Sequence, residues 1–133
     1  MNEARRKKRG DDRTTGCAVE VTLGLLGGRW KAVVLFHLLK GKKRFGELRR
    51  QVPNCTQRML TLQLRELEED GLVTRTVFPQ VPPRVEYELT DFGRSAEPML
   101  LAMRDWGEEY KRQCGDGAFT GARPKVSSSS AVA

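Results

Sequence analysis

The apolar positions follow a helical period between Thr56 and Gly71. Leu60, Leu64 and Leu67 are spaced by four and three residues, which places them on one face of a helix. Thr56 stands where its hydroxyl can accept a hydrogen bond from an early backbone N–H, and Gly71 suits the left-handed residue that ends a helix. We therefore expect a helix that begins after Thr56 and ends close to Gly71.

The face opposite these leucines is mostly polar. Arg58, Leu62 and Arg65 lie on it, and Gln57 and Thr61 flank them on one side. All except Leu62 can donate hydrogen bonds to phosphates or base edges. The acidic residues of the segment come late, so its N-terminal half carries the positive potential, as in a recognition helix that enters the major groove. The alternative is an ordinary amphipathic helix whose outer face is solvated.

Two helices are expected upstream of this segment. The first lies within Gly16–Gly28 and turns Leu23 and Leu26 to one face. The second, Trp30–Leu39, is apolar on nearly all sides, which is typical of a buried helix. We expect Lys31, at its start, to reach outward towards a phosphate.

A short basic helix, Phe45–Val52, precedes the polar turn that leads to Thr56. Arg44, Arg49 and Arg50 are expected to point outward, and the proline at position 53 ends the helix. This helix, the turn and the helix after Thr56 have the order of a helix-turn-helix.

Two strands are predicted next, Leu72–Phe78 and Arg84–Leu89, because β-branched and aromatic residues are frequent and apolar and charged residues alternate in the second strand. A proline-rich loop joins them. Gln80 and Arg84 are the residues near this tip that could contact a minor groove or phosphates. A hairpin after a helix-turn-helix predicts a winged helix, although a rigid surface hairpin without a partner is the alternative.

A further helix is expected after Thr90, which suits an N-cap, and Pro98 should kink or split it. Beyond Pro98 an apolar stripe needs a cover. It could pack on Leu23 and Leu26 of the same chain or on the same helix of a second chain, and we expect both, in a two-fold dimer. The stripe consists of Met99, Met103, Trp106 and Tyr110. The fold class is therefore α+β, mainly α: a winged helix-turn-helix with a β-hairpin wing and N- and C-terminal dimerisation helices.

Composition supports a nucleic-acid partner. The 133 residues carry a formal net charge of +7, and the excess of Lys and Arg remains after the basic N-terminal segment is set aside. We expect one domain at 16–112, with disordered tails at 1–15 and 113–133. No apolar run is long enough to span a bilayer and no secretory signal is evident, so we expect no membrane partner and a cytoplasmic location.

Catalytic and metal-binding roles find little support in the sequence. One histidine and three cysteines are scattered along the chain, without the close pairs that hold zinc. No Ser/His/Asp grouping, phosphate-binding glycine loop or paired acids in a cleft is apparent. We therefore expect neither an enzyme nor a cofactor, and His37 is interpreted as a core or boundary residue.

Several motifs resemble those of the HxlR-type transcriptional regulators, from about residue 16 to residue 110. They are CAVE at 17–20, GGRWK at 27–31, RFGEL at 44–48, MLTLQLRELEEDGLV at 59–73, VPPRVEYELT at 81–90 and WG at 106–107. The resemblance implies a bacterial, dimeric, MarR-like winged-helix regulator of transcription that binds double-stranded DNA. A repressor is the expected form, and its effector is not implied. A two-fold dimer should read an imperfect palindrome with half-sites about 10 bp apart.

Members of this family often have a cysteine at the place of Cys17, and some use it to sense oxidants or electrophiles. The residues themselves agree, because Cys17 lies close to the start of the first helix, whose positive end favours a thiolate. Cys55 is a candidate disulfide partner from the other chain. The alternative for Cys17 is a small buried hydrophobe.

One alternative function retains the winged helix. In that case the domain would bind proteins and would have lost its affinity for DNA. The basic residues retained at Lys31, Arg44, Arg58 and Arg65 speak against that function, and a gel shift with genomic fragments distinguishes the two.

Overall fold

The computed structural model describes residues 16–114 of the chain. Its helices are α2 (Ala18–Leu26), α3 (Lys31–Leu38), α4 (Phe45–Gln51), α5 (Gln57–Glu69), α6 (Asp91–Arg94) and α7 (Glu97–Gln113). Its strands are β1 (Lys43–Arg44), β2 (Val73–Phe78) and β3 (Arg84–Leu89). The tails predicted at 1–15 and 113–133 lie outside the described residues, apart from residues 113 and 114, of which residue 113 is the last residue of α7.

The core forms where α3 and α5 bury their apolar faces. In α5 the leucines expected to share a face are all buried, which confirms the predicted orientation of this helix. The apolar run of α3 is buried at three positions and half-buried at the others that follow Lys31. The buried positions of the two helices are Val34, Leu35, Leu38, Leu60, Leu64 and Leu67. One face of α5 is therefore fixed by packing, and its other face is left to solvent.

Local hydrogen bonds define both ends of α5. Thr56 Oγ1 accepts from the backbone N–H of Met59 at 3.1 Å, which confirms the predicted N-cap. At the other end Gly71 has φ +81°, and the N–H of Leu72 donates to the carbonyl of Leu67 at 2.9 Å. A glycine in the left-handed region, followed by a hydrogen bond from residue i to the carbonyl of residue i−5, is the Schellman motif that ends many helices. The predicted stop at Gly71 is confirmed.

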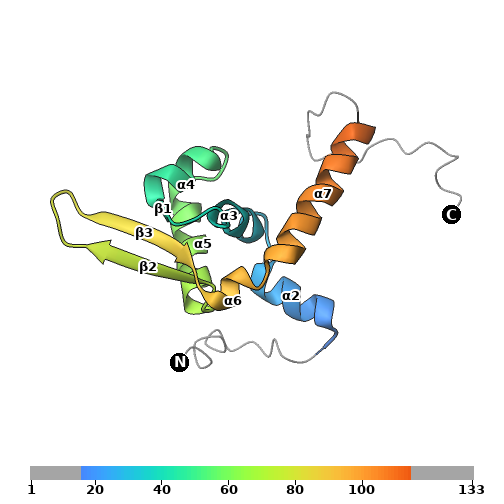
Figure 1. Ribbon diagram of the computed structural model, residues 1–133, viewed down its shortest axis with the longest axis horizontal. Coiled ribbons are helices and arrows are strands. Elements are labelled where there is room, and N and C mark those ends of the chain that lie inside the picture. Colours follow the sequence, from blue (N-terminus) through green and yellow to red (C-terminus); the bar gives the residue numbers. More distant parts are fainter. Residues whose placement is uncertain (1–15, 115–133) are drawn as a thin grey trace, which may run out of the picture. The chain divides into compact units, whose positions relative to one another are not determined.

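The sheet has three antiparallel strands in the order β1-β3-β2. Strands β2 and β3 pair from Val73↔Leu89 to Phe78↔Arg84, and their hairpin extends away from α3, α4 and α5 in Figure 1. The hairpin was predicted, whereas β1 was not, because the sequence analysis did not distinguish its residues from a loop. Two pairings with β3, Lys43 with Tyr87 and Arg44 with Glu86, make β1 a strand. These elements form a winged helix-turn-helix, as expected.

Thr90 fastens the end of the wing to the end of α5. Its hydroxyl donates to the carbonyl of Gly71 at 2.6 Å and accepts from the N–H of Gly93 at 3.0 Å, while its own N–H donates to the carbonyl of Leu72 at 3.1 Å. The predicted N-cap is confirmed, and it has a second function. The hydroxyl connects the start of α6 to the turn after α5.

The helix expected after Thr90 is split into α6 and α7. Pro98 lies in the first turn of α7, where its missing N–H removes no bond within the helix. A second compact unit begins at Pro98, so α7 is described by itself. Within α7 the rings of Trp106 and Tyr110 are stacked, with centroids 6.1 Å apart, and Met99 and Tyr110 are half-buried.

None of the helices within residues 16–114 is both long enough and apolar enough to cross a membrane.

Candidate nucleic-acid interface

The face of α5 opposite its buried leucines is open to solvent. Arg58, Thr61 and Arg65 are exposed along it, and the side chain of Leu62 between them is 40% exposed. Gln57 is exposed in the first turn. The predicted orientation of all five residues is confirmed. Except for Leu62, their side chains can donate hydrogen bonds to phosphate oxygens and base edges.

Charge is unevenly distributed along α5. The first turn of α5 contains no acidic residue, whereas Glu66, Glu68 and Glu69 lie close to the C-terminal end of the helix. The positive end of the helix dipole and Arg58 therefore act together at the N-terminal half. An anion approaching α5 meets its most favourable potential there, which is the end that a recognition helix inserts first.

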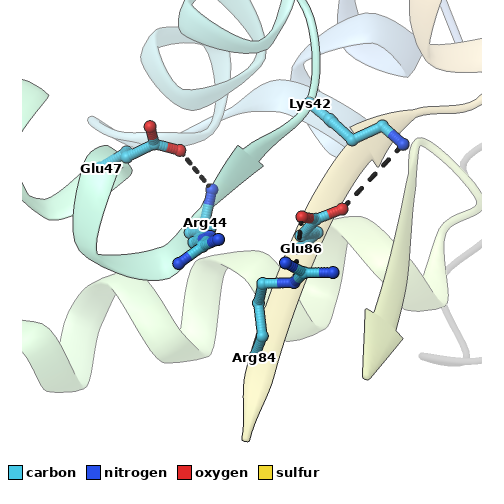
Figure 2. Close-up of polar contacts among 5 residues, drawn as sticks. All are labelled: Lys42, Arg44, Glu47, Arg84 and Glu86. Carbon is cyan, nitrogen blue, oxygen red and sulfur yellow. Dashed lines mark hydrogen bonds and ion pairs between the residues drawn. The ribbon is translucent and has the colours of Figure 1, made fainter. Parts of the chain in front are cut away.

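Arg44 and Thr56 occupy the residues immediately before α4 and α5. The backbone N–H of Arg44 donates to Glu47 Oε1 at 2.8 Å, as Figure 2 shows, and the Arg44 side chain is exposed. The Thr56 side chain is also exposed, although its oxygen caps α5. Both side chains therefore extend from backbone that is held at a helix start.

A carboxylate lies between two cations on the wing. Figure 2 shows Glu86 on β3 between Lys42 and Arg84. The Lys42 Nζ lies 4.0 Å from Glu86 Oε1, and the Arg84 Nε lies 3.4 Å from Glu86 Oε2. The Glu86 side chain is only 18% exposed, so the positive charge of the wing is partly neutralised at this point.

Arg84, which was expected to be available near the tip of the wing, is 30% exposed and makes two contacts within the wing. Its guanidinium carbon lies 4.2 Å from the centroid of the Phe78 ring, in addition to the ion pair with Glu86. The strand register causes this contact, because it places Phe78 directly opposite Arg84. Gln80, in the loop, is exposed as expected.

The expectation that Lys31 reaches outward is wrong. Lys31 is 7% exposed, and its Nζ lies 2.7 Å from Glu66 Oε1. Burial of an ammonium group is favourable only with a partner, and Glu66 on α5 supplies it. Lys31 therefore joins α3 to the recognition helix and is not part of the exposed basic face.

Arg49 also departs from the expectation of a fully outward side chain. It is half-buried on α4, and its Nη1 donates to Gln57 Oε1 at 3.2 Å. Its Nε is buried, and no hydrogen-bond acceptor for it is found within residues 16–114. Arg49 thus connects α4 to the first residue of α5. From the sequence Arg49 was predicted only to be a basic surface residue, because periodicity carries no signal for a pair across a turn.

The three cysteines have different environments and are all free thiols. Cys17 is exposed and is the N-cap residue of α2. Cys55 is buried, and this burial raises the pKa of its thiol, opposed by the nearby charges of Arg49 and Arg29. As a thiol that is buried and hard to ionise, Cys55 is a poorer disulfide partner than the sequence analysis expected.

Both predicted dimerisation helices leave apolar side chains exposed. On α2, Val19 and Leu23 are 66% and 60% exposed, and on α7, Met103 and Trp106 are 51% and 76% exposed. Leu26 was predicted to lie in the dimer interface, but it is only 8% exposed and belongs to the core. Exposed tryptophan and leucine side chains at helical spacing are typical of a surface that is covered by a partner.

His37 is half-buried at the edge of the core, with its ring 5.6 Å from that of Phe36. Burial lowers its pKa, and the charges of Lys40 and Lys43 lower it further. Residues 16–114 contain no cluster of three or more His, Cys, Asp or Glu side chains that could hold a metal ion.

Comparison with known proteins agrees with this geometry. Residues 25–114 match the model of the HxlR-like helix-turn-helix family. The uncharacterized HTH-type transcriptional regulator YdeP of Bacillus subtilis (strain 168) is 62% identical over 96 residues, which cover 72% of this chain and 75% of YdeP.

Solved structures give the same result. The redox regulator HypR in its oxidized form is 60% identical, with a TM-score of 0.67 over 70% of this chain and 96% of HypR. The reduced form of the transcriptional regulator YodB from B. subtilis is 34% identical, with a TM-score of 0.61 over 72% of this chain and 95% of YodB. The chain therefore belongs to the HxlR-like helix-turn-helix family of transcriptional regulators, and its helix-turn-helix is a DNA-binding domain.

Proposed function

We propose that this regulator is a homodimer that reads an imperfect palindrome through the exposed face of α5. The observation that carries the proposal is the row of Arg58, Thr61 and Arg65 on a helix whose opposite face is fixed in the core. A helix held in this way fits the major groove, where base pairs are distinguishable. A two-fold dimer requires two half-sites about 10 bp apart or slightly more.

The exposed residues divide into two groups by position. Gln57, Arg58 and Thr61 lie in the N-terminal half of α5 and are proposed to reach base edges. Arg65 and Arg44 are proposed to bind phosphates. Thr56 and the wing residue Gln80 add further sugar–phosphate contacts. Arg84 contributes by shaping the wing, because Phe78 and Glu86 hold its guanidinium.

The dimer interface is proposed to consist of α2 and α7. Leu23 on α2 and Met103 and Trp106 on α7 supply the exposed apolar surface, with Met99 and Tyr110 beside them on α7. An isologous interface built from these helices gives the two-fold axis that a palindrome demands. Bound over a promoter, such a dimer excludes other proteins from the same DNA, so we assign it as a repressor. We propose a cytoplasmic location for it.

The test of this function is selection of genomic DNA fragments by the purified full-length protein, followed by footprinting. We expect protection of two half-sites related by a dyad. Binding to all fragments alike would contradict sequence-specific reading, and protection of a single half-site would contradict the dimer.

The first prediction concerns Arg58. Its replacement, Arg58→Ala, should weaken operator binding by about 1–3 kcal/mol if its guanidinium pairs with a guanine edge. Preference should be relaxed at one position in each half-site, and the salt dependence should change little. Arg44→Ala is the contrasting variant: it should weaken all sequences alike and flatten the salt dependence. Competition binding at several salt concentrations separates the two, and a reversed pattern would exchange their roles.

We also propose that oxidants or electrophiles acting on Cys17 alter operator binding. Cys17 is exposed and begins α2, which is the helix proposed for the dimer interface. A related structure, 60% identical, is that of a redox regulator, HypR. A modified thiol at this place would change how the two copies meet, and hence the spacing of the two α5 helices, without touching the DNA face.

The second prediction is a change of about 10-fold or more in operator affinity after mild diamide treatment, which Cys17→Ser should abolish. Diamide oxidises two thiols to one disulfide, here Cys17 of the two copies in the proposed interface, and takes up the two electrons and two protons that they lose. Cys114→Ser is the matched control, because Cys114 is also exposed but lies after α7. Unchanged affinity while mass spectrometry shows Cys17 fully modified would refute the switch.

A further inference from the structure

We propose that Arg49 is a positioning residue that sets which hydrogen-bonding group α5 presents at its first residue, Gln57. The inference rests on the proposed function, since it assumes that α5 reads base edges. Arg49 Nη1 donates to Gln57 Oε1 at 3.2 Å. The amide oxygen is thereby turned towards α4, and the amide Nε2 becomes the group that faces an incoming base pair.

The chemistry of the pair fixes the orientation of the amide. A guanidinium has only N–H donors, so the Gln57 atom that faces it must be the oxygen and not the nitrogen. A hydrogen bond from an ionised donor is also stronger than one between neutral groups. Rotating the Gln57 amide by half a turn would bring its NH₂ against the guanidinium and lose this bond.

The surroundings of Arg49 make it a suitable anchor. The side chain is half-buried on α4, and its Nε is buried within the protein. The turn between the two helices is itself held, because the N–H of Cys55 donates to the carbonyl of Val52 at 2.9 Å. Gln57 is then fixed at both ends: by its place in the first turn of α5 and by Arg49 at the tip of its side chain.

A consequence for sequence preference follows. A free glutamine pairs with adenine through both its oxygen and its nitrogen, accepting from N6 and donating to N7. Because Arg49 holds the amide oxygen towards α4, Gln57 cannot turn both groups of its amide to one adenine, and its Nε2 faces the base as a donor. We therefore infer that the base facing Gln57 presents an acceptor, namely guanine O6 or N7, thymine O4 or adenine N7, and that cytosine, whose N4 group is a donor, is disfavoured there.

The experiment is a double-mutant cycle on the full-length protein, using operators randomised in one half-site. Arg49→Met keeps the aliphatic part of the side chain and removes every hydrogen-bond donor. Gln57→Ala removes the amide that is proposed to contact the base. Each should reduce the preference at one shared position by about 5-fold or more, and the double variant should lose no more than either single variant. Gln57→Glu keeps a partner for Arg49 and presents an acceptor, so it should shift the preference towards cytosine.

Arg50→Met is the matched control, because it removes the same charge from an exposed neighbour on α4. It should leave the base preference unchanged. Independent, additive losses, or an Arg49→Met effect that is equal for all sequences and reduces the salt slope by about one, would identify Arg49 as a phosphate contact and overturn the inference. If Arg58→Ala and Gln57→Ala both leave DNA binding intact, the proposed function fails instead.

Discussion

A chain carrying Met103→Glu and Trp106→Glu is expected to be a folded monomer that binds its operator at least about 100-fold more weakly. The two side chains are the most exposed large apolar groups of α7, and Trp106 is 76% exposed. A carboxylate at each place would have to lose its hydration in a helix-to-helix interface, which is strongly unfavourable. Without the second copy, each α5 binds a half-site alone and the gain from linking two sites is lost.

Light scattering and circular dichroism would check this prediction, together with gel shifts on the full operator. Arg104→Glu is the matched control, since it lowers the net charge equally and lies about 100° around α7 from Met103 and about 160° from Trp106. Its pairing with Asp105 is a surface contact of small energetic value. A wild-type chain that is monomeric at micromolar concentration would remove the basis for the proposed interface.

Features set by neighbouring residues could be predicted from the sequence. The cap at Thr56, the leucine face of α5 and the end at Gly71 depend on residues within one or two helical turns of each other. Periodicity and capping report such short-range constraints directly. For the same reason the split of the last helix close to Pro98 was predicted.

Features that depend on residues distant in sequence could not be predicted. The sequence indicates that Lys31 is an exposed cation at the start of a helix. In the fold, Glu66 of α5 lies 2.7 Å from its Nζ. The sequence indicates that Arg84 is a cation near the tip of the wing. In the fold, the strand register places Phe78 opposite Arg84, and the guanidinium lies over its ring. In both cases a tertiary partner neutralises or covers a charge that composition alone assigns to DNA. The predicted interface was therefore too broad at Lys31, and its centre on α5 stays a prediction.

The replacement Gly93→Ala is expected to destabilise the domain by about 3 kcal/mol and to lower its melting temperature by roughly 10 °C or more. A Cβ at Gly93 would lie 2.1 Å from the carbonyl oxygen of Leu72 and 3.1 Å from its carbonyl carbon. These are backbone atoms, so no side-chain rotation can relieve the overlap. The start of α6 would have to move away from the turn that follows α5.

This movement should also affect DNA binding, because the Thr90 hydroxyl joins Gly71 to Gly93 and so ties the end of the wing to the end of α5. A displaced α6 breaks that connection, and the wing then loses its fixed position beside α5. Gly46→Ala is the matched control: its Cβ would come no closer than 3.8 Å, to a flexible side-chain atom of Arg50, and should stabilise α4 by about 0.5–1 kcal/mol. Thermal and urea unfolding of both variants measures the difference. If Gly93→Ala unfolds like the wild type while Gly46→Ala behaves as expected, the close approach between α6 and Leu72 is not part of the folded protein. In that case the connection between wing and recognition helix must depend on the β2–β3 pairing alone.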